Sequence, residues 1–393
     1  MADRDHLENA FSMPVGFKIH EVRPRRGEAL ERAPSLTSLA AAAAPPPLGP
    51  LVAFAGTWSG MGFNTIFRPQ NQTFDLPTPA PGDNLLELNL TSETLSFNAS
   101  LGSIPNRGML QDDLFMNGVP YVQSINDVTN PAPPTGIHFE PGIWLSVPAT
   151  TDPQEPISVA RMASIPHGTT IIAQGVALPT TNGPPNIHPV DITPFPIGGG
   201  PPIRFPSQTG LTQGTARLPQ DLTPWLNAGT ITQGLLDDPN QMLRKAISVQ
   251  NILSTTTIVV STNPQSPLFG GGTSNIAFLL GNAAGAPANA NAIQMDAVFW
   301  IETVEHQLHI DFPNGSAPTT IQPRGAPFGL PLVTFLLDPP VQLTGPRIIK
   351  VTSTQIQYSQ KVILNFNGLS WPHVSVATLV PTAPLPIPDS AWQ

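Results

Sequence analysis

The sequence predicts an all-β fold, an up-and-down antiparallel β-barrel of about ten strands. Charged residues make up only 11% of the chain and hydrophobic residues 40%, with 32 Gly and 49 Pro, a balance that favours short strands and many turns over long helices. Short runs of β-branched, aromatic and alternating residues recur between Pro, Gly and Asn turns. About ten such runs can be counted, the number at which a barrel of this kind encloses a ligand cavity.

The barrel follows an N-terminal region of different composition. Residues 1–49 are expected to form an arm and an Ala/Pro-rich linker, and residues 50–393 a single barrel domain. Glycines around Trp58 would let the first strand bend sharply. Further strand-like runs lie at residues 85–97, 114–128, 137–147, 157–165 and 169–178, and the pattern resumes at 294–305, 306–312, 348–366 and 374–380.

Residues 179–293 interrupt this pattern and predict a large, mostly irregular insertion. One helix is expected from about residue 239 to residue 250, because Asp238 can cap it and Pro239 fits its first turn. Residues 255–261 are expected to form an extra strand within the insertion.

Composition excludes several classes of function. A net charge of -9 offers no basic surface for nucleic acid, and the absence of cysteine excludes disulfides, iron–sulfur clusters and a thiolate haem ligand. Residues 39–55 are apolar but broken by four prolines, which argues against a membrane span, and no signal peptide is visible. We therefore expect a soluble, cytoplasmic protein without a membrane partner.

The segment around His373 carries the most specific chemical signal. Strand side chains alternate between faces, so His373, Ser375, Ala377 and Leu379 should share one face. An imidazole followed by small residues leaves room for a flat ligand, and neutral imidazole is a good ligand for haem iron. The alternative is a histidine that closes a turn after Pro372 and satisfies a backbone group.

Three segments together resemble the nitrobindin family, haem-binding barrels of the calycin superfamily related to fatty-acid-binding proteins. They are the Gly-Thr-Trp strand at residues 56–58, a His-x-Glu-x-Gly strand at 138–142, and the Pro-His-x-x-x-Ala-x-Leu ending at 372–379. The resemblance covers roughly residues 50–178 and 294–380. It implies haem b as cofactor, His373 as the iron ligand, and chemistry with nitric oxide or peroxynitrite. The insertion and His167 depart from the family pattern, and the insertion would be able to cover the open haem face.

The remaining candidate residues each have a structural alternative. His138, oriented by Glu140, and His167 are candidates for acid–base chemistry on the distal side of the haem, whereas a buried His–Glu pair would only join strands. Arg161 is a candidate partner of a haem propionate, although an exposed strand arginine is commoner. Trp58, Trp144 and Tyr358 would line the cofactor or belong to the core. The other histidines discussed, His188, His306 and His309, are expected to face solvent.

These features predict a haem b protein with His-ligated iron that acts on nitrogen oxides, peroxynitrite or peroxides, as a peroxidase or a peroxynitrite isomerase-like enzyme would. The alternative is a cofactor-free carrier, or a cyclase or isomerase, for an apolar small molecule such as a fatty acid or terpenoid. The partner is a small molecule in either case. The substrate and the formation of a homo-oligomer stay open.

Overall fold

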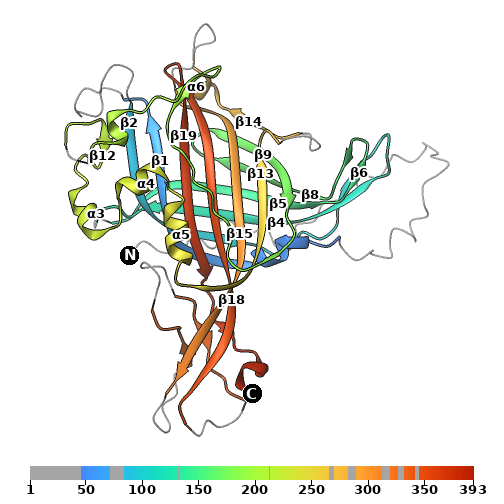
Figure 1. Cartoon of the computed structure of the whole chain (residues 1–393). Helices are drawn as coiled ribbons and strands as arrows, with labels where there is room; N and C mark the ends of the chain where they lie inside the picture. Colours follow the sequence, from blue (N-terminus) through green and yellow to red (C-terminus); the bar gives the residue numbers. More distant parts are fainter. Residues whose placement is uncertain are drawn as a thin grey trace, which may run out of the picture.

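The computed structural model describes residues 46–70, 84–130, 133–211, 213–264, 270–281, 289–311, 319–325, 332–340 and 345–393. The predicted N-terminal arm lies outside these residues as far as residue 45. Ten antiparallel strands close into a barrel, as expected, because β13 pairs with β9 as well as with β15 (Figure 1). In spatial order the barrel strands are β13 (Asn251–Ser261), β15 (Asn291–Ile310), β18 (Arg347–Phe366), β19 (Leu369–Pro381), β1 (Gly56–Arg68), β2 (Leu85–Phe97), β4 (Leu114–Asp127), β5 (Thr135–Val147), β8 (Ser158–Ile165) and β9 (Thr169–Ala177).

One end of the barrel is closed by a short 3₁₀ helix, η1 (Gly49–Phe54), whose Leu51 and Phe54 are fully buried. The indole of Trp58 donates a hydrogen bond to the carbonyl of Phe54 over 2.9 Å, which ties the helix to the first strand. Gly60 is required here because a Cβ would lie 1.9 Å from the Thr378 carbonyl oxygen. The close contact between β1 and β19 therefore depends on glycine. We call the opposite end of the barrel the mouth.

Residues 178–250 form an outer layer over β1, β2 and β19 (Figure 1). Its apolar side chains pack on the outward-facing side chains of the barrel wall, and the rings of Phe205 and Trp371 stack with centroids 5.4 Å apart. The wall is therefore covered on both faces. The elements of the layer are β10 (Thr181–Asn182), β11 (Phe195–Pro196), η2 (Pro206–Gln208), β12 (Arg217–Leu218), α3 (Thr223–Ala228), α4 (Gln233–Asp237) and α5 (Gln241–Ile247).

The structure corrects the predicted insertion at residues 179–293. The expected extra strand is β13, a member of the barrel with Ile258 and Val260 in the interior core, so the outer layer ends at residue 250. A second connection, between β13 and β15, contains β14 (Gly272–Asn275) and α6 (Ala277–Leu280). The described part of 179–293 thus contains four short α-helices and one 3₁₀ helix where one helix was expected. The expected helix at about 239–250 is α5, which begins after Asn240.

β15 and β18 continue past the closed end as a two-stranded stalk, so the predicted strands at 294–305 and 306–312 are one strand (Figure 1). A third apolar cluster, which includes Leu308, Phe335, Ile349 and Trp392, fills the stalk. None of the described helices is long and apolar enough to cross a membrane. The stalk also contains β16 (Thr320–Ile321), β17 (Phe335–Leu336), β20 (Leu385–Pro386) and η4 (Asp389–Trp392), while β3 (Ile104–Asn106), β6 (Thr150–Thr151) and β7 (Gln154–Glu155) lie beside β4, β5 and β8.

Candidate functional site

His373 lies at the mouth end of β19. Ala377 and Leu379 belong to the interior core, whereas Val374 and Val376 pack under the outer layer, so the predicted alternation is confirmed. The Nε2 atom of His373 lies 2.8 Å from the amide nitrogen of Asn64 on the neighbouring strand β1. The same amide donates to the Ser375 hydroxyl over 2.7 Å. Because an amide nitrogen is only a donor, Nε2 is the accepting nitrogen of the ring.

The imidazole of His373 is uncharged at neutral pH. Burial lowers its pKa to about 3, and the nearby His138 and His167 add to this effect because a positive charge on either disfavours a second one. A neutral imidazole with a lone pair is the form that binds a metal.

His138 and His167 face one another at the same end of the barrel. Their ring centroids are 5.7 Å apart, and His167 Nε2 lies 3.0 Å from the backbone oxygen of Ile137, to which it donates. Burial lowers the pKa of His167, as does His138. The structure therefore places all three predicted histidines, from β5, the β8–β9 turn and β19, around the mouth.

Glu140 and Arg161 form a buried ion pair below the mouth. Arg161 donates from Nη2 to Glu140 Oε1 over 2.6 Å, and from Nε to the Tyr121 hydroxyl over 2.8 Å. Burial by itself would raise the pKa of Glu140, but the Arg161 guanidinium and hydrogen bonds from His138 and Tyr121 outweigh it and lower the pKa to about 2. The alternative of an exposed strand arginine is wrong, because Arg161 is 1% exposed.

The ionised Glu140 also orients His138. Glu140 Oε2 lies 3.2 Å from His138 Nε2, and a carboxylate can only accept, so Nε2 carries the proton. The Nδ1 atom of His138 is then the nitrogen that can take up another proton.

Glu93 is a second interior carboxyl that the sequence reasoning missed. Its carboxylate accepts from the Tyr358 hydroxyl over 2.6 Å, from Thr91 over 3.0 Å and from Gln123 over 3.3 Å. Burial raises its pKa to about 7, although these hydrogen bonds oppose the shift. Its position between Thr91 and Leu95 on one face of a strand would have marked it as inward-facing.

The predicted aromatic residues occupy different levels of the barrel. Trp58 and Trp144 lie toward the closed end, where the Trp144 and Phe299 rings meet edge to face with centroids 5.1 Å apart. Tyr358 lies between these rings and the mouth and is engaged by Glu93 and Gln123. Thus His138, His167 and His373 surround the mouth, Glu140, Arg161 and Tyr358 lie below it, and the two tryptophans are core residues.

Among the described residues, no group of three or more His, Asp or Glu side chains is placed to hold a metal ion together. No family model and no curated protein matches the chain. A solved structure, that of Rv2717c from M. tuberculosis, aligns over 86% of this chain and 100% of its own length, with 12% sequence identity and a TM-score of 0.33.

Proposed function

We propose that the protein binds haem b at the mouth of the barrel, where His373 would hold the iron. The observation that supports this most directly is the state of His373: it is an uncharged imidazole at the mouth, on the strand face whose Ala377 and Leu379 belong to the interior core. Haem iron needs a neutral imidazole nitrogen of this kind.

The donor set fits a haem with a single protein ligand. His373 Nε2 contacts the neutral Asn64 amide and the Ser375 hydroxyl, and it has no carboxylate partner among the described residues. An iron bond would replace these neutral contacts, and a neutral hydrogen bond contributes only about 0.5–1.5 kcal/mol net. Asn64 and Ser375 retain their own hydrogen bond after this exchange.

The other mouth residues supply proton transfer and orientation. When bound, haem would provide the oxidative or nitrogen-oxide chemistry. His138 would exchange a proton at Nδ1 while Glu140 holds its Nε2–H, and Arg161 would keep Glu140 ionised. His167 donates from Nε2 to the Ile137 carbonyl, which leaves its other ring nitrogen to accept a hydrogen bond from a bound ligand.

The carrier alternative has less support from the interior. The space toward the closed end is filled by Phe54, Trp58, Trp144 and Phe299, and the charged Glu140–Arg161 pair lies above them. A long alkyl chain would have to displace these rings and pass a buried charged pair, to which it offers no hydrogen bond.

The test is a titration of the full chain with haem, in which binding is monitored by the Soret absorption band. We expect a His-ligated spectrum for the wild type and loss or strong weakening of binding for His373→Ala. His188→Ala removes an exposed histidine and is the matched control. An unchanged Soret band in His373→Ala would contradict the assignment, and colourless protein that binds a fluorescent fatty acid would support the carrier.

His138→Leu and His167→Leu separate the two distal candidates. We expect both variants to keep haem, because neither residue is the proposed ligand. We expect His138→Leu to slow the reaction with peroxide more than His167→Leu, because only His138 is oriented by a buried carboxylate. Wild-type peroxide reactivity and ligand off-rates in both variants would exclude a distal role.

A further inference from the structure

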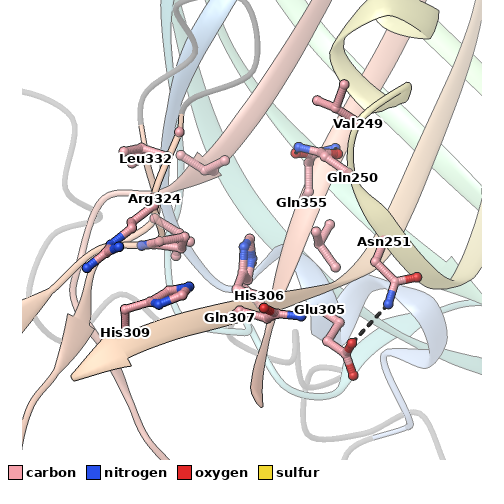
Figure 2. Close-up of a pocket in the computed structure, with 16 residues that line it drawn as sticks. Val249, Gln250, Asn251, Glu305, His306, Gln307, His309, Arg324, Leu332 and Gln355 are labelled. Carbon is pink, nitrogen blue, oxygen red and sulfur yellow. Dashed lines mark hydrogen bonds between the residues drawn. The ribbon is translucent and has the colours of Figure 1, made fainter. Parts of the chain in front are cut away.

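A cavity of about 300 Å³ lies outside the barrel, between the outer layer and the stalk (Figure 2). Its walls come from residues 249–251 after α5, the stalk parts of β15 and β18, the segments 323–325 and 332–333, and Val380. Val380 and His373 lie at opposite ends of β19, so about 20 Å separates this cavity from the mouth. Its volume is at the lower end of the range for small-molecule sites.

The cavity has a polar wall of uncharged hydrogen-bonding groups. The side-chain amides of Gln250 and Gln355 bond to each other in both directions over 2.9 and 3.0 Å. His306 Nε2 lies 2.8 Å from the Ser353 hydroxyl, and burial lowers the pKa of this histidine to about 4. His306 was expected to face solvent, but it is partly buried with its ring edge to face on Phe335.

The two carboxyl groups near the cavity do not present an unpaired negative charge. Gln355 donates over 2.6 Å to Glu302, which is fully buried and whose other oxygen has no partner among the described residues. Burial raises the pKa of Glu302 to about 8, so it is mostly protonated at neutral pH. Glu305 accepts from Asn251 over 2.9 Å and from Lys350 over 3.0 Å.

Arg324 lines the cavity without a carboxylate partner among the described residues. Arg324 and His309 lie on the same side of the cavity, across from Asn251 and Glu305 (Figure 2). Within the part of the chain that the structure describes, Arg324 makes no ion pair. A guanidinium without an ion-pair partner, beside a wall of mostly uncharged hydrogen-bonding groups, favours an anion, and carboxylate is the group that it binds bidentately.

We propose that this cavity is a second ligand site, separate from the barrel mouth, for a small organic carboxylate. The carboxylate would meet Arg324 and His309, and the organic part would pack on Val249, Leu332 and Val380, which line the same space. The proposal is independent of haem, because no mouth residue contributes to the cavity.

Titration calorimetry with benzoate on the full chain tests the site, with benzamide as the uncharged ligand of the same shape. We expect benzoate to bind wild-type protein, benzamide to bind at least about tenfold more weakly, and Arg324→Gln to weaken benzoate binding at least about tenfold. Arg324 is exposed, so the variant should fold normally.

Two control variants should leave benzoate binding unchanged. Arg204→Gln removes an exposed arginine that pairs with Asp237 on the outer layer, and His373→Ala alters only the mouth. The proposal is overturned if benzoate does not bind, if benzamide binds equally well, or if Arg324→Gln has no effect. It is also overturned if His373→Ala abolishes benzoate binding, since the ligand would then occupy the mouth.

Discussion

At the scale of single residues, the buried ion pair of Arg161 and Glu140 predicts that removing either partner alone destabilises the fold. Arg161→Met would leave the Glu140 carboxylate fully buried without its cation. Breaking one side of a buried ion pair costs about 3–5 kcal/mol. We therefore expect the free energy of unfolding in urea to fall by that amount. Combining the change with Glu140→Leu should recover much of the loss, because no uncompensated charge stays inside.

A surface pair provides the comparison for this prediction. Arg107 and Asp113 form an exposed ion pair, so Arg107→Met should change the unfolding free energy far less than Arg161→Met. If Arg161→Met were no more destabilising than Arg107→Met, the interior pair would not be holding β5 and β8 together.

At the scale of elements, the outer layer is required to cover the barrel wall. Replacing residues 184–249 by a short Gly/Ser link keeps β13 but uncovers Phe63, Trp371, Val374 and Val376, all fully buried. We expect the variant to bind a hydrophobic dye and to aggregate, as seen by light scattering, because exposed apolar patches of this kind promote association.

The β6–β7 hairpin is a suitable control deletion. It projects away from the barrel (Figure 1), and none of its residues belongs to the three apolar clusters. Shortening residues 150–155 to two glycines should leave a monodisperse protein with little dye binding. A monodisperse, dye-free 184–249 variant would mean that the barrel wall tolerates solvent without its cover.

At the scale of the whole molecule, buried titratable groups set the dependence of stability on pH. The pKa of His373 is lowered from 6.5 to about 3, so its contribution is lost as pH falls from 6.5 through 3, because only the unfolded chain takes up a proton there. Glu140, lowered from 4.5 to about 2, acts in the same direction below pH 4.5. Both groups therefore make the fold less stable as the pH falls, His373 below pH 6.5 and Glu140 below pH 4.5.

Glu93 and Glu302 act in the opposite direction. Their pKa values are raised from 4.5 to about 7 and about 8, so in the folded protein they keep a proton that the unfolded chain releases. Their contribution is full below pH 4.5 and is lost as pH rises to about 8. We expect the free energy of unfolding in urea to fall between pH 6.5 and pH 8, by up to about 1.4 kcal/mol per pH unit for each group that is still protonated in the folded protein.

Glu302→Gln tests this assignment, because the amide cannot ionise. We expect its stability to fall less than that of the wild type between pH 7 and pH 8. Glu305→Gln, which removes a carboxylate already ionised and paired with Lys350, should keep the wild-type slope. If the unfolding free energy of all three proteins changed equally with pH, Glu302 would not be protonated in the folded protein between pH 7 and pH 8.

The sequence by itself determined the features that depend on local periodicity. Alternation along residues 373–379 placed His373 inside the barrel, and turn residues between short strands predicted a closed barrel of about ten strands. The same reasoning placed His138 and Glu140 on one face of β5. These predictions succeed because the side-chain period of a strand is two residues wherever the strand lies in the fold.

Only the tertiary structure decided which distant residues meet. β13 is recognisable as a strand, but its place in the barrel depends on pairing with β9 and β15. The Glu93–Tyr358 hydrogen bond joins residues 265 positions apart, and the cavity near Arg324 arises where the outer layer meets the stalk. Local patterns carry no information on such contacts, because strand register and layer packing are set by the burial of many side chains at once.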